Sequence, residues 1–180
     1  GIFKTRDRRI TWANPAIEKM FGYRIGESVG MDTRFFYPDE DMYVAVGAQA
    51  YDALENGRSF RVQVPLRRRD GRELWVDVSG AVLDRANGET IWCMLDVTEE
   101  RRAQREQHRL NRALRLLGDC NLALFRAQAE DALFADICRL VVHSGGYLMA
   151  WIGLAEHDAA RSVRPVAVFG KDEGYVAGVR

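Results

Sequence analysis

The sequence predicts an α+β fold: a five-stranded antiparallel sheet with helices on one face, then a long helix and an incomplete second unit of the α/β type. Three observations support this prediction. Apolar residues alternate in short stretches bounded by turns before residue 98, two helical patterns lie between the second and third stretch, and a seven-residue repeat begins after Asp96. The 47% hydrophobic and 29% charged content is typical of a folded globular chain.

The first two strands and two helices are predicted from turn and capping residues. Two short strands flank the polar turn 7–9. Asn14 caps the helix that follows, Pro15 is tolerated in its first turn and Gly22 ends it. A second helix follows Pro38, with an acidic first turn and a stripe of core residues made of Met42, Val46, Ala50 and Leu54.

Three further strands follow, each bounded by turn residues. They are predicted over 59–67, 73–83 and 90–97, and the pairs Asp70–Gly71 and Asn87–Gly88 separate them. Consecutive strands joined by tight turns pair antiparallel. The first part of the chain is therefore expected to form one five-stranded sheet.

The pattern changes period at Asp96. Asp96 and Glu99 have the spacing of a capping box, so we expect a long helix to begin there. Its seven-residue repeat favours a parallel dimeric coiled coil over a helix packed on its own chain. The repeat comprises Ala103, Leu110, Leu117 and Leu124, interleaved with Gln107, Leu114 and Asn121. Its candidate dimer contacts are Leu110, Leu114 and Leu117.

A shorter second unit is expected after this helix. An amphipathic helix over 133–141 ends at Ser144–Gly146, and two strands are predicted over 147–156 and 162–169. Two helices and two strands cannot close a sheet, so we expect this unit to be incomplete. The predicted domains are 1–98, a linker helix at 99–117 and a truncated unit at 118–180.

The composition excludes several classes of function. Lys plus Arg and Asp plus Glu both number 26, so no net field attracts nucleic acid. The longest strongly apolar stretch, 145–155, is about half of the ~20 residues that a membrane helix needs, which predicts no membrane contact from this segment. Lacking a targeting segment at Gly1, the chain is interpreted as a piece of a longer cytoplasmic protein. The cysteines are expected to be reduced, buried thiols: Cys93, Cys120 and Cys138.

The first 98 residues resemble a PAS domain with its C-terminal PAC motif. Five motifs, each weak alone, occur in the order and spacing of that family. They are Asp7–Ile10; Trp12–Ala16; Phe21–Tyr23 with Glu27 and Gly30; Arg69–Arg72 with Trp75 and Val76; and Asp96–Glu99. The resemblance implies a sensory domain that binds a ligand, forms dimers or does both.

From about Leu116 the chain resembles the start of a GAF domain of the kind that follows PAS domains in bacterial sensors. The matching residues are Gly145 and Gly146, Ala150–Leu154, Arg164–Ala167, Gly170, Gly174 and Tyr175. The match covers less than half of such a domain. It implies a downstream output domain in the same polypeptide, such as a diguanylate cyclase or a histidine kinase.

The resemblance disfavours haem and flavin. Haem-binding relatives ligate iron through a helix histidine, but the histidines here lie outside the PAS segment, which leaves Met42 as a minor alternative. Photoactive flavin relatives need a cysteine that is Thr33 here, before the matching Arg34 and Phe35. Met94 also stands where a flavin-contacting glutamine is expected. No cofactor is therefore predicted.

An apolar set on the helix-covered face of the sheet is either a filled core or a pocket for an unidentified apolar small molecule. It comprises Phe35, Phe36, Met42, Val46, Val76, Val78, Trp92 and Met94. The opposite face carries apolar side chains that predict a homodimer contact. These are Trp75, Ile91, Cys93 and Leu95.

The sequence predicts no catalysis in this fragment. A phosphate-binding glycine loop, clustered metal ligands and a nucleophile beside a histidine are all missing, and His108 lacks the acidic residue and proline that follow a kinase phosphohistidine. We instead expect a signal to pass through Asp96, Thr98 and Glu99 into the long helix. The competing interpretation is a ligand-free structural dimerisation module of a diguanylate cyclase or histidine kinase.

Overall fold

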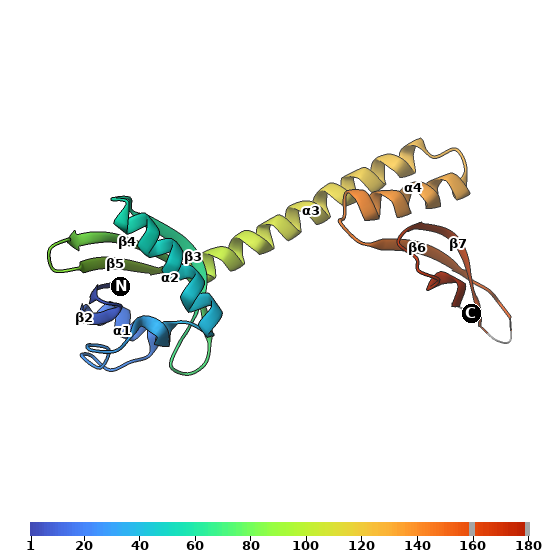
Figure 1. The fold of residues 1–180 in the computed structure, drawn as a ribbon. Coiled ribbons are helices and arrows are strands. Elements are labelled where there is room, and N and C mark those ends of the chain that lie inside the picture. The colour runs from blue at the N-terminus through green and yellow to red at the C-terminus, as the bar shows by residue number, and fades with distance from the viewer. Residues whose placement is uncertain (159–160, 179–180) are drawn as a thin grey trace. The chain divides into compact units, whose positions relative to one another are not determined.

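The computed structural model describes residues 1–158 and 161–178 and divides the chain into two compact units, Gly1–Ala103 and Gln104–Arg180 (Figure 1). The first unit holds five strands, two helices and a short 3₁₀ helix. Their bounds are β1 (Ile2–Arg6), β2 (Arg9–Ala13), α1 (Pro15–Phe21), η1 (Thr33–Phe36), α2 (Glu40–Glu55), β3 (Phe60–Arg67), β4 (Glu73–Asp84) and β5 (Glu89–Asp96).

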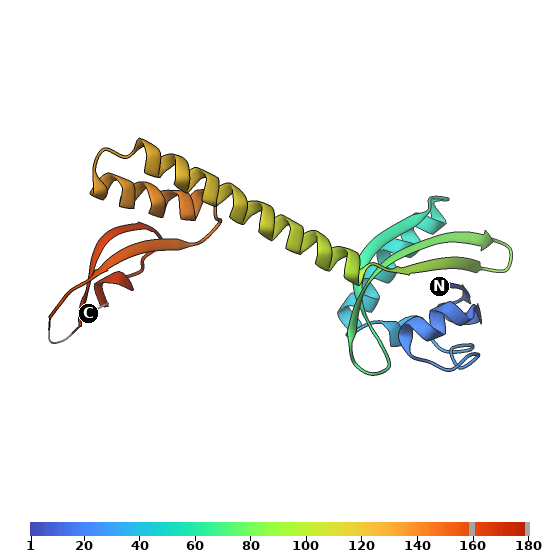
Figure 2. The ribbon, with the colours of Figure 1, turned by 180° about the vertical axis from the view of Figure 1, so that it is seen from behind.

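The five strands form one antiparallel sheet in the order β2-β1-β5-β4-β3. The N-terminal strand β1 therefore lies beside the last strand β5, and Phe3 is opposite Trp92. Helices α1 and α2 lie on the same side of this sheet in both views (Figures 1 and 2). The α+β architecture predicted from the sequence is confirmed.

Capping residues fix both ends of α1 as predicted, and Asp39, expected in the first turn of α2, instead caps that helix. The Asn14 side chain accepts a hydrogen bond from the Ile17 amide, and Gly22 ends α1 in the left-handed conformation at φ 80°. Asp39 caps α2 by accepting a bond from the Met42 amide over 2.8 Å. These bonds satisfy backbone groups that a helix end leaves without an intrahelical partner.

A buried carboxylate holds the loop after α1. Glu18 is 2% exposed, and its Oε1 accepts bonds from the amides of Gly26 and Ser28 and from the Ser28 hydroxyl over 2.8 to 3.2 Å. Burial opposes ionisation of Glu18, but these hydrogen bonds outweigh it and lower the pKa of the carboxyl group. The loop is thereby fixed against the helix that precedes it.

The second unit contains the greater part of a long helix, a second helix and an antiparallel strand pair. The bounds are α3 (Thr98–Arg126), α4 (Glu130–His143), β6 (Met149–Ala155), β7 (Val163–Gly170) and the short η2 (Val176–Gly178). Helix α4 packs against both strands and buries Cys138. Helix α3 continues past residue 117, so the predicted boundary between linker helix and second domain falls inside it.

The expectation of three buried cysteines is wrong in part. Cys138 is buried and Cys120 is half-buried, but Cys93 is exposed. Its side chain lies on the face of the sheet that α1 and α2 do not cover, because strand residues alternate between the two faces and Trp92 and Met94 point into the core. Strand alternation, rather than the apolar surroundings in sequence, decides its exposure.

Candidate functional site

The start of α3 is tied to strand β4 by a pair of hydrogen bonds. The Val97 amide donates to the carbonyl oxygen of Trp75, and the Trp75 amide donates to the Thr98 hydroxyl, each over 2.9 Å. The Thr98 amide in turn donates to Asp96 Oδ1 over 2.9 Å. We call Trp75 and residues 96–98 the joint, because they connect the last strand, its neighbour β4 and the helix.

The capping box predicted for Asp96 and Glu99 does not match the observed contacts. The first helical bond runs from the Arg101 amide to the Val97 carbonyl, so Val97 occupies the cap position and Asp96 precedes it. The Glu99 carboxylate forms an ion pair with Arg102 over 2.8 Å. The sequence spacing was correct for a helix start, but the Thr98 hydroxyl contributes more contact with the sheet than Glu99 does.

A line of polar side chains extends from the joint across the outer face of the sheet. The Arg101 guanidinium lies 3.8 Å from the centre of the Trp75 ring and donates to Gln63 Oε1 over 2.7 Å. Gln63 Nε2 donates to Asp77 Oδ2 over 3.2 Å, and Arg61 donates two bonds to the Asp77 carboxylate over 2.9 and 2.8 Å. The first turn of α3 is therefore connected to both β3 and β4.

Asp77 is the least exposed member of this line, with a side chain that is 8% exposed. Hydrogen bonds from Arg61, followed by that from Gln63, hold the pKa of its carboxyl group below the ordinary value, although burial acts in the other direction. No sequence pattern had selected the four residues of this line: Arg61, Gln63, Asp77 and Arg101. The available signal was the opposite charge of Arg61 and Asp77, which lie on two strands of a predicted hairpin and can therefore meet across it.

The eight residues of the predicted apolar set lie in or against the core of the first unit. Phe36, Val76, Val78 and Met94 are at most 2% exposed, Val46 and Trp92 are buried, and Phe35 and Met42 pack at the edge of the cluster. Ring contacts link Phe3 with Phe36 and Trp92. The structure thus brings the eight residues together. That they bind a small molecule stays a prediction.

Two clefts open elsewhere on the first unit. The larger, of about 690 Å³, lies between α2 and the β4–β5 hairpin and is lined in part by Arg8, Tyr51, Leu54, Val82 and Thr90. The Arg8 guanidinium donates to the Tyr43 carbonyl over 2.9 Å and lies 3.5 Å from the centre of that ring. A smaller cleft of about 490 Å³ beside η1 includes Phe35 of the predicted set.

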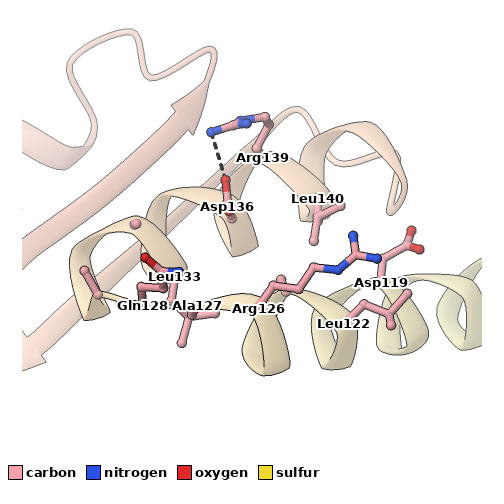
Figure 3. A pocket seen from close by; sticks show the side chains of 12 residues that line it. Asp119, Leu122, Arg126, Ala127, Gln128, Leu133, Asp136, Arg139 and Leu140 are labelled. Atoms are coloured by element: carbon pink, nitrogen blue, oxygen red, sulfur yellow. Dashed lines mark ion pairs between the residues drawn. The ribbon is translucent and has the colours of Figure 1, made fainter.

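The second unit has a pocket of about 790 Å³ between the end of α3 and α4 (Figure 3). Leu122 and Arg126 of α3 and Leu133 and Leu140 of α4 line it, and Asp136 and Arg139 form an ion pair over 3.0 Å at its edge. Its lining mixes leucine and alanine side chains with the charged side chains of Asp119, Arg126, Asp136 and Arg139.

The residues predicted to form a dimer contact lie on two surfaces. Ile91, Cys93 and Leu95 lie on the outer face of the sheet, where Leu95 is 60% exposed, while Trp75 on the same face is half-buried under Arg101. On α3 the leucines of the seven-residue repeat are exposed by more than half of their surface, namely Leu110, Leu114 and Leu117.

The described residues contain neither a cluster suited to a metal ion nor a helix suited to span a membrane. Within 1–158 and 161–178, His, Cys, Asp and Glu form no group of three that could hold a metal ion. Among the same residues, no helix combines the length and apolarity needed to cross a bilayer. His108 and His143 lie on α3 and α4, and His157 follows β6, so none of the three histidines belongs to the first unit.

Comparison with known proteins identifies relatives of the first unit. A sequence model of the family described as "PAS fold" matches residues 1–97. The chain is also 30% identical over 106 residues to the sensor protein TdiS of Thauera aromatica. That match covers 58% of this chain but only 19% of TdiS, so the chain spans about a fifth of that protein.

Solved structures share the fold of the same region. The PAS domain of a protein from Colwellia psychrerythraea is 18% identical with a TM-score of 0.50, covering 54% of this chain and 86% of that domain. The LOV domain of a blue-light-activated histidine kinase from Erythrobacter litoralis is 21% identical with a TM-score of 0.46, covering 54% and 94%. The first likeness concerns the fold alone, and the second neither supports nor excludes a flavin here.

Proposed function

Since the chain belongs to the PAS fold family through residues 1–97, we propose that it is the sensory input module of a signal-transduction protein. The observation that carries this proposal is the joint. A backbone hydrogen bond, a bond to the Thr98 hydroxyl and the Arg101 contacts fasten the start of α3 to β4 and β3, so a displacement of these strands moves the helix with them. The 30% identity to a sensor protein supports the same role.

In this mechanism the signal acts on the sheet and leaves through α3. A ligand or partner that prefers one arrangement of β4 and β5 shifts the population of the joint between two states. A coupling free energy of about 1.4 kcal/mol changes the output tenfold, which is within the range of a few hydrogen bonds. Asp96 contributes by accepting a hydrogen bond from the Thr98 amide, and Thr98 by accepting one from the Trp75 amide. Glu99 contributes inside the helix, where it forms an ion pair with Arg102.

The module is further proposed to act as a homodimer. The exposed apolar side chains on the outer sheet face and the leucines of α3 are both surfaces that a second copy would cover. We also propose that the first domain includes a C-terminal PAC motif, that residues 118–180 are the first part of a GAF-like domain, and that an output domain lies further along the same polypeptide. The protein is proposed to be cytoplasmic, and the module to be sensory rather than catalytic.

The packed interior favours a second candidate, the ligand-free dimerisation module. Phe3, Phe36 and Trp92 fill the space between sheet and helices, so a small molecule in that space would have to displace them. In this alternative the module is purely structural and only holds two copies of the chain together. Native mass spectrometry of the chain separates the two, because a bound metabolite supports ligand sensing and a ligand-free dimer supports the alternative.

The relay itself is tested in the full-length protein. Asp96→Ala and Thr98→Ala should each abolish most of the change in output caused by the signal, because they remove the bonds that tie α3 to the sheet. Thr11→Ala is the matched control, since Thr11 is exposed on β2 and far along the chain from the joint. Normal signalling by the Thr98 variant would contradict the proposed route.

A further inference from the structure

A small basic notch lies between α3 and the end of α4. Its volume is about 360 Å³, and five side chains line it: His108, Asn111, Arg112 and Arg115 of α3, and Ser144 directly after α4. We call it the α3 notch. Helix positions 108, 111, 112 and 115 share one side of the helix because three and four residues complete about one turn. All five side chains offer hydrogen-bond donors, and none is a carboxylate.

The charge of the α3 notch is not balanced locally. Residues 107–118 contain three arginines and a histidine but no Asp or Glu. Among the described residues, the ion pairs of Glu99 with Arg102 and of Asp136 with Arg139 include neither Arg112 nor Arg115, and Asp119, one turn after Arg115, forms no ion pair with it. Converging cations of this kind create a local positive potential although the whole chain has no net charge.

The chain after α4 is shaped to accept one of these arginines. Gly146 has a φ of 71°, which L side chains rarely adopt, and a Cβ atom built there would lie 2.8 Å from Arg112 Nη1. Glycine therefore lets the Arg112 guanidinium lie directly against the backbone between α4 and β6. The same connection passes beside α3 in both ribbon views (Figures 1 and 2).

We propose that the α3 notch binds a phosphate group. A guanidinium presents paired donors that match two oxygens of a tetrahedral oxyanion, and a phosphate ester carries about −1.5 to −2 charges at neutral pH. The amide of Asn111 and the hydroxyl of Ser144 supply neutral donors at the same concavity. A volume of about 360 Å³ is at the small end of ligand sites, which fits one phosphoryl group rather than a large ligand.

The site goes beyond the sensory role proposed above and does not depend on it. A phosphate held by Arg112 and Arg115 on one side and Ser144 on the other fastens α3 to the chain that follows α4 within the second unit. The leucines of the seven-residue repeat lie elsewhere around the helix and stay exposed. A phosphate-containing molecule therefore has access to the notch whether or not α3 forms a dimer.

Isothermal titration of the 180-residue chain with inorganic phosphate, in a buffer free of other oxyanions, tests the proposal. We expect saturable binding that Arg112→Gln and Arg115→Gln each weaken about tenfold or more, since each removes a charge-assisted contact. Arg109→Gln is the matched control: it removes the same charge from the same helix but does not line the notch. It should change the dissociation constant by less than about threefold.

A parallel titration with adenosine monophosphate distinguishes the source of the phosphate group. If the nucleotide binds more tightly than inorganic phosphate, the ligand of the α3 notch is a phosphate ester. If both bind equally, the ligand is the free phosphate ion. Arg112→Lys keeps the charge without the paired donors and should weaken binding several-fold, which separates recognition from attraction alone. The proposal is overturned if neither ligand saturates below about 10 mM or if Arg109→Gln weakens binding as much as Arg112→Gln. Neither result bears on the relay at the joint.

Discussion

Replacing Thr98 with valine isolates one bond of the joint. Valine has nearly the shape of threonine but no hydroxyl, so the Trp75 amide loses the acceptor that it now contacts at 2.9 Å. The neighbouring bond from the Val97 amide to the Trp75 carbonyl does not involve the Thr98 side chain and is retained. The substitution therefore weakens the attachment of α3 to β4 without removing packing volume.

The size of the effect follows from the exposure of the two residues. A buried amide that loses its partner costs about 1 to 3 kcal/mol. Trp75 and Thr98 are both half-buried, so water can replace part of the bond and the lower end applies. A loss of about 1 kcal/mol increases the population of the opened joint about fivefold.

Amide hydrogen exchange measured by NMR reads this opening residue by residue. In Thr98→Val the exchange rates of the Trp75 and Arg101 amides should rise about fivefold, while amides in the core strands change little. Thr98→Ser is the matched control because it keeps the hydroxyl. Unchanged exchange of the Trp75 amide in the valine variant, or an equal rise in the serine variant, would refute the reasoning.

Three further predictions follow from particular contacts. Asp77→Ala should lower the free energy of unfolding by about 1 to 3 kcal/mol in urea denaturation, against less than about 0.5 kcal/mol for the exposed control Asp41→Ala. Because folding lowers the pKa of Asp77, its contribution to stability is present above the unfolded pKa and is lost as the pH falls through the folded pKa. Arg61→Gln should reduce this pH-dependent loss, since it removes the main cause of the lowered pKa. Gly80→Ala should destabilise the first unit by about 1 to 3 kcal/mol in thermal unfolding, because the added Cβ would overlap the Trp92 ring. Gly118→Ala in α3 meets open space and should stabilise its helix by up to about 1 kcal/mol. If Gly80→Ala did not destabilise the protein, the Trp92 ring would have to move aside at no cost. Leu114→Lys should remove the dimer in native mass spectrometry while Val44→Lys, on α2 outside both proposed surfaces, should not, and a dimer that survives the first change would place the contact away from α3.

The parts of the fold set by neighbouring residues were predictable. Asn14 caps α1 through a residue three positions away, and Gly22 ends it with its own backbone conformation. The turn pairs and the alternation of apolar residues likewise predicted the hairpins of the antiparallel sheet, whereas the pairing of β1 with β5 joins the two ends of the unit and has no short-range signal. The joint was predicted as a position along the chain for the same reason.

The contacts that define the site depend on residues far apart in the sequence. Arg101 meets Gln63 across 38 residues, Arg61 meets Asp77 across 16 and Thr98 meets the Trp75 amide across 23. Taken alone, each side chain is an ordinary polar residue. The opposite charges of Arg61 and Asp77 on a predicted hairpin offered a signal for that pair, but no local pattern selected the contacts of Arg101 and Thr98. The filling of the core by Phe3 and its ring neighbours was equally beyond pattern reasoning, since alternation identifies the buried face but not the shape of the space.

The central claim is that α3 transmits the state of the sheet as a continuous helix fastened at the joint. An insertion series in the full-length protein tests it directly, with two or seven residues of helix-forming sequence added after Gln107 and the signal-dependent output measured. Seven residues nearly complete two helical turns and restore the phase of the repeat, whereas two residues turn the following helix by about 200°. Normal regulation with seven and lost regulation with two is the result that we expect, and equal regulation by both proteins would show that α3 is a tether rather than a relay.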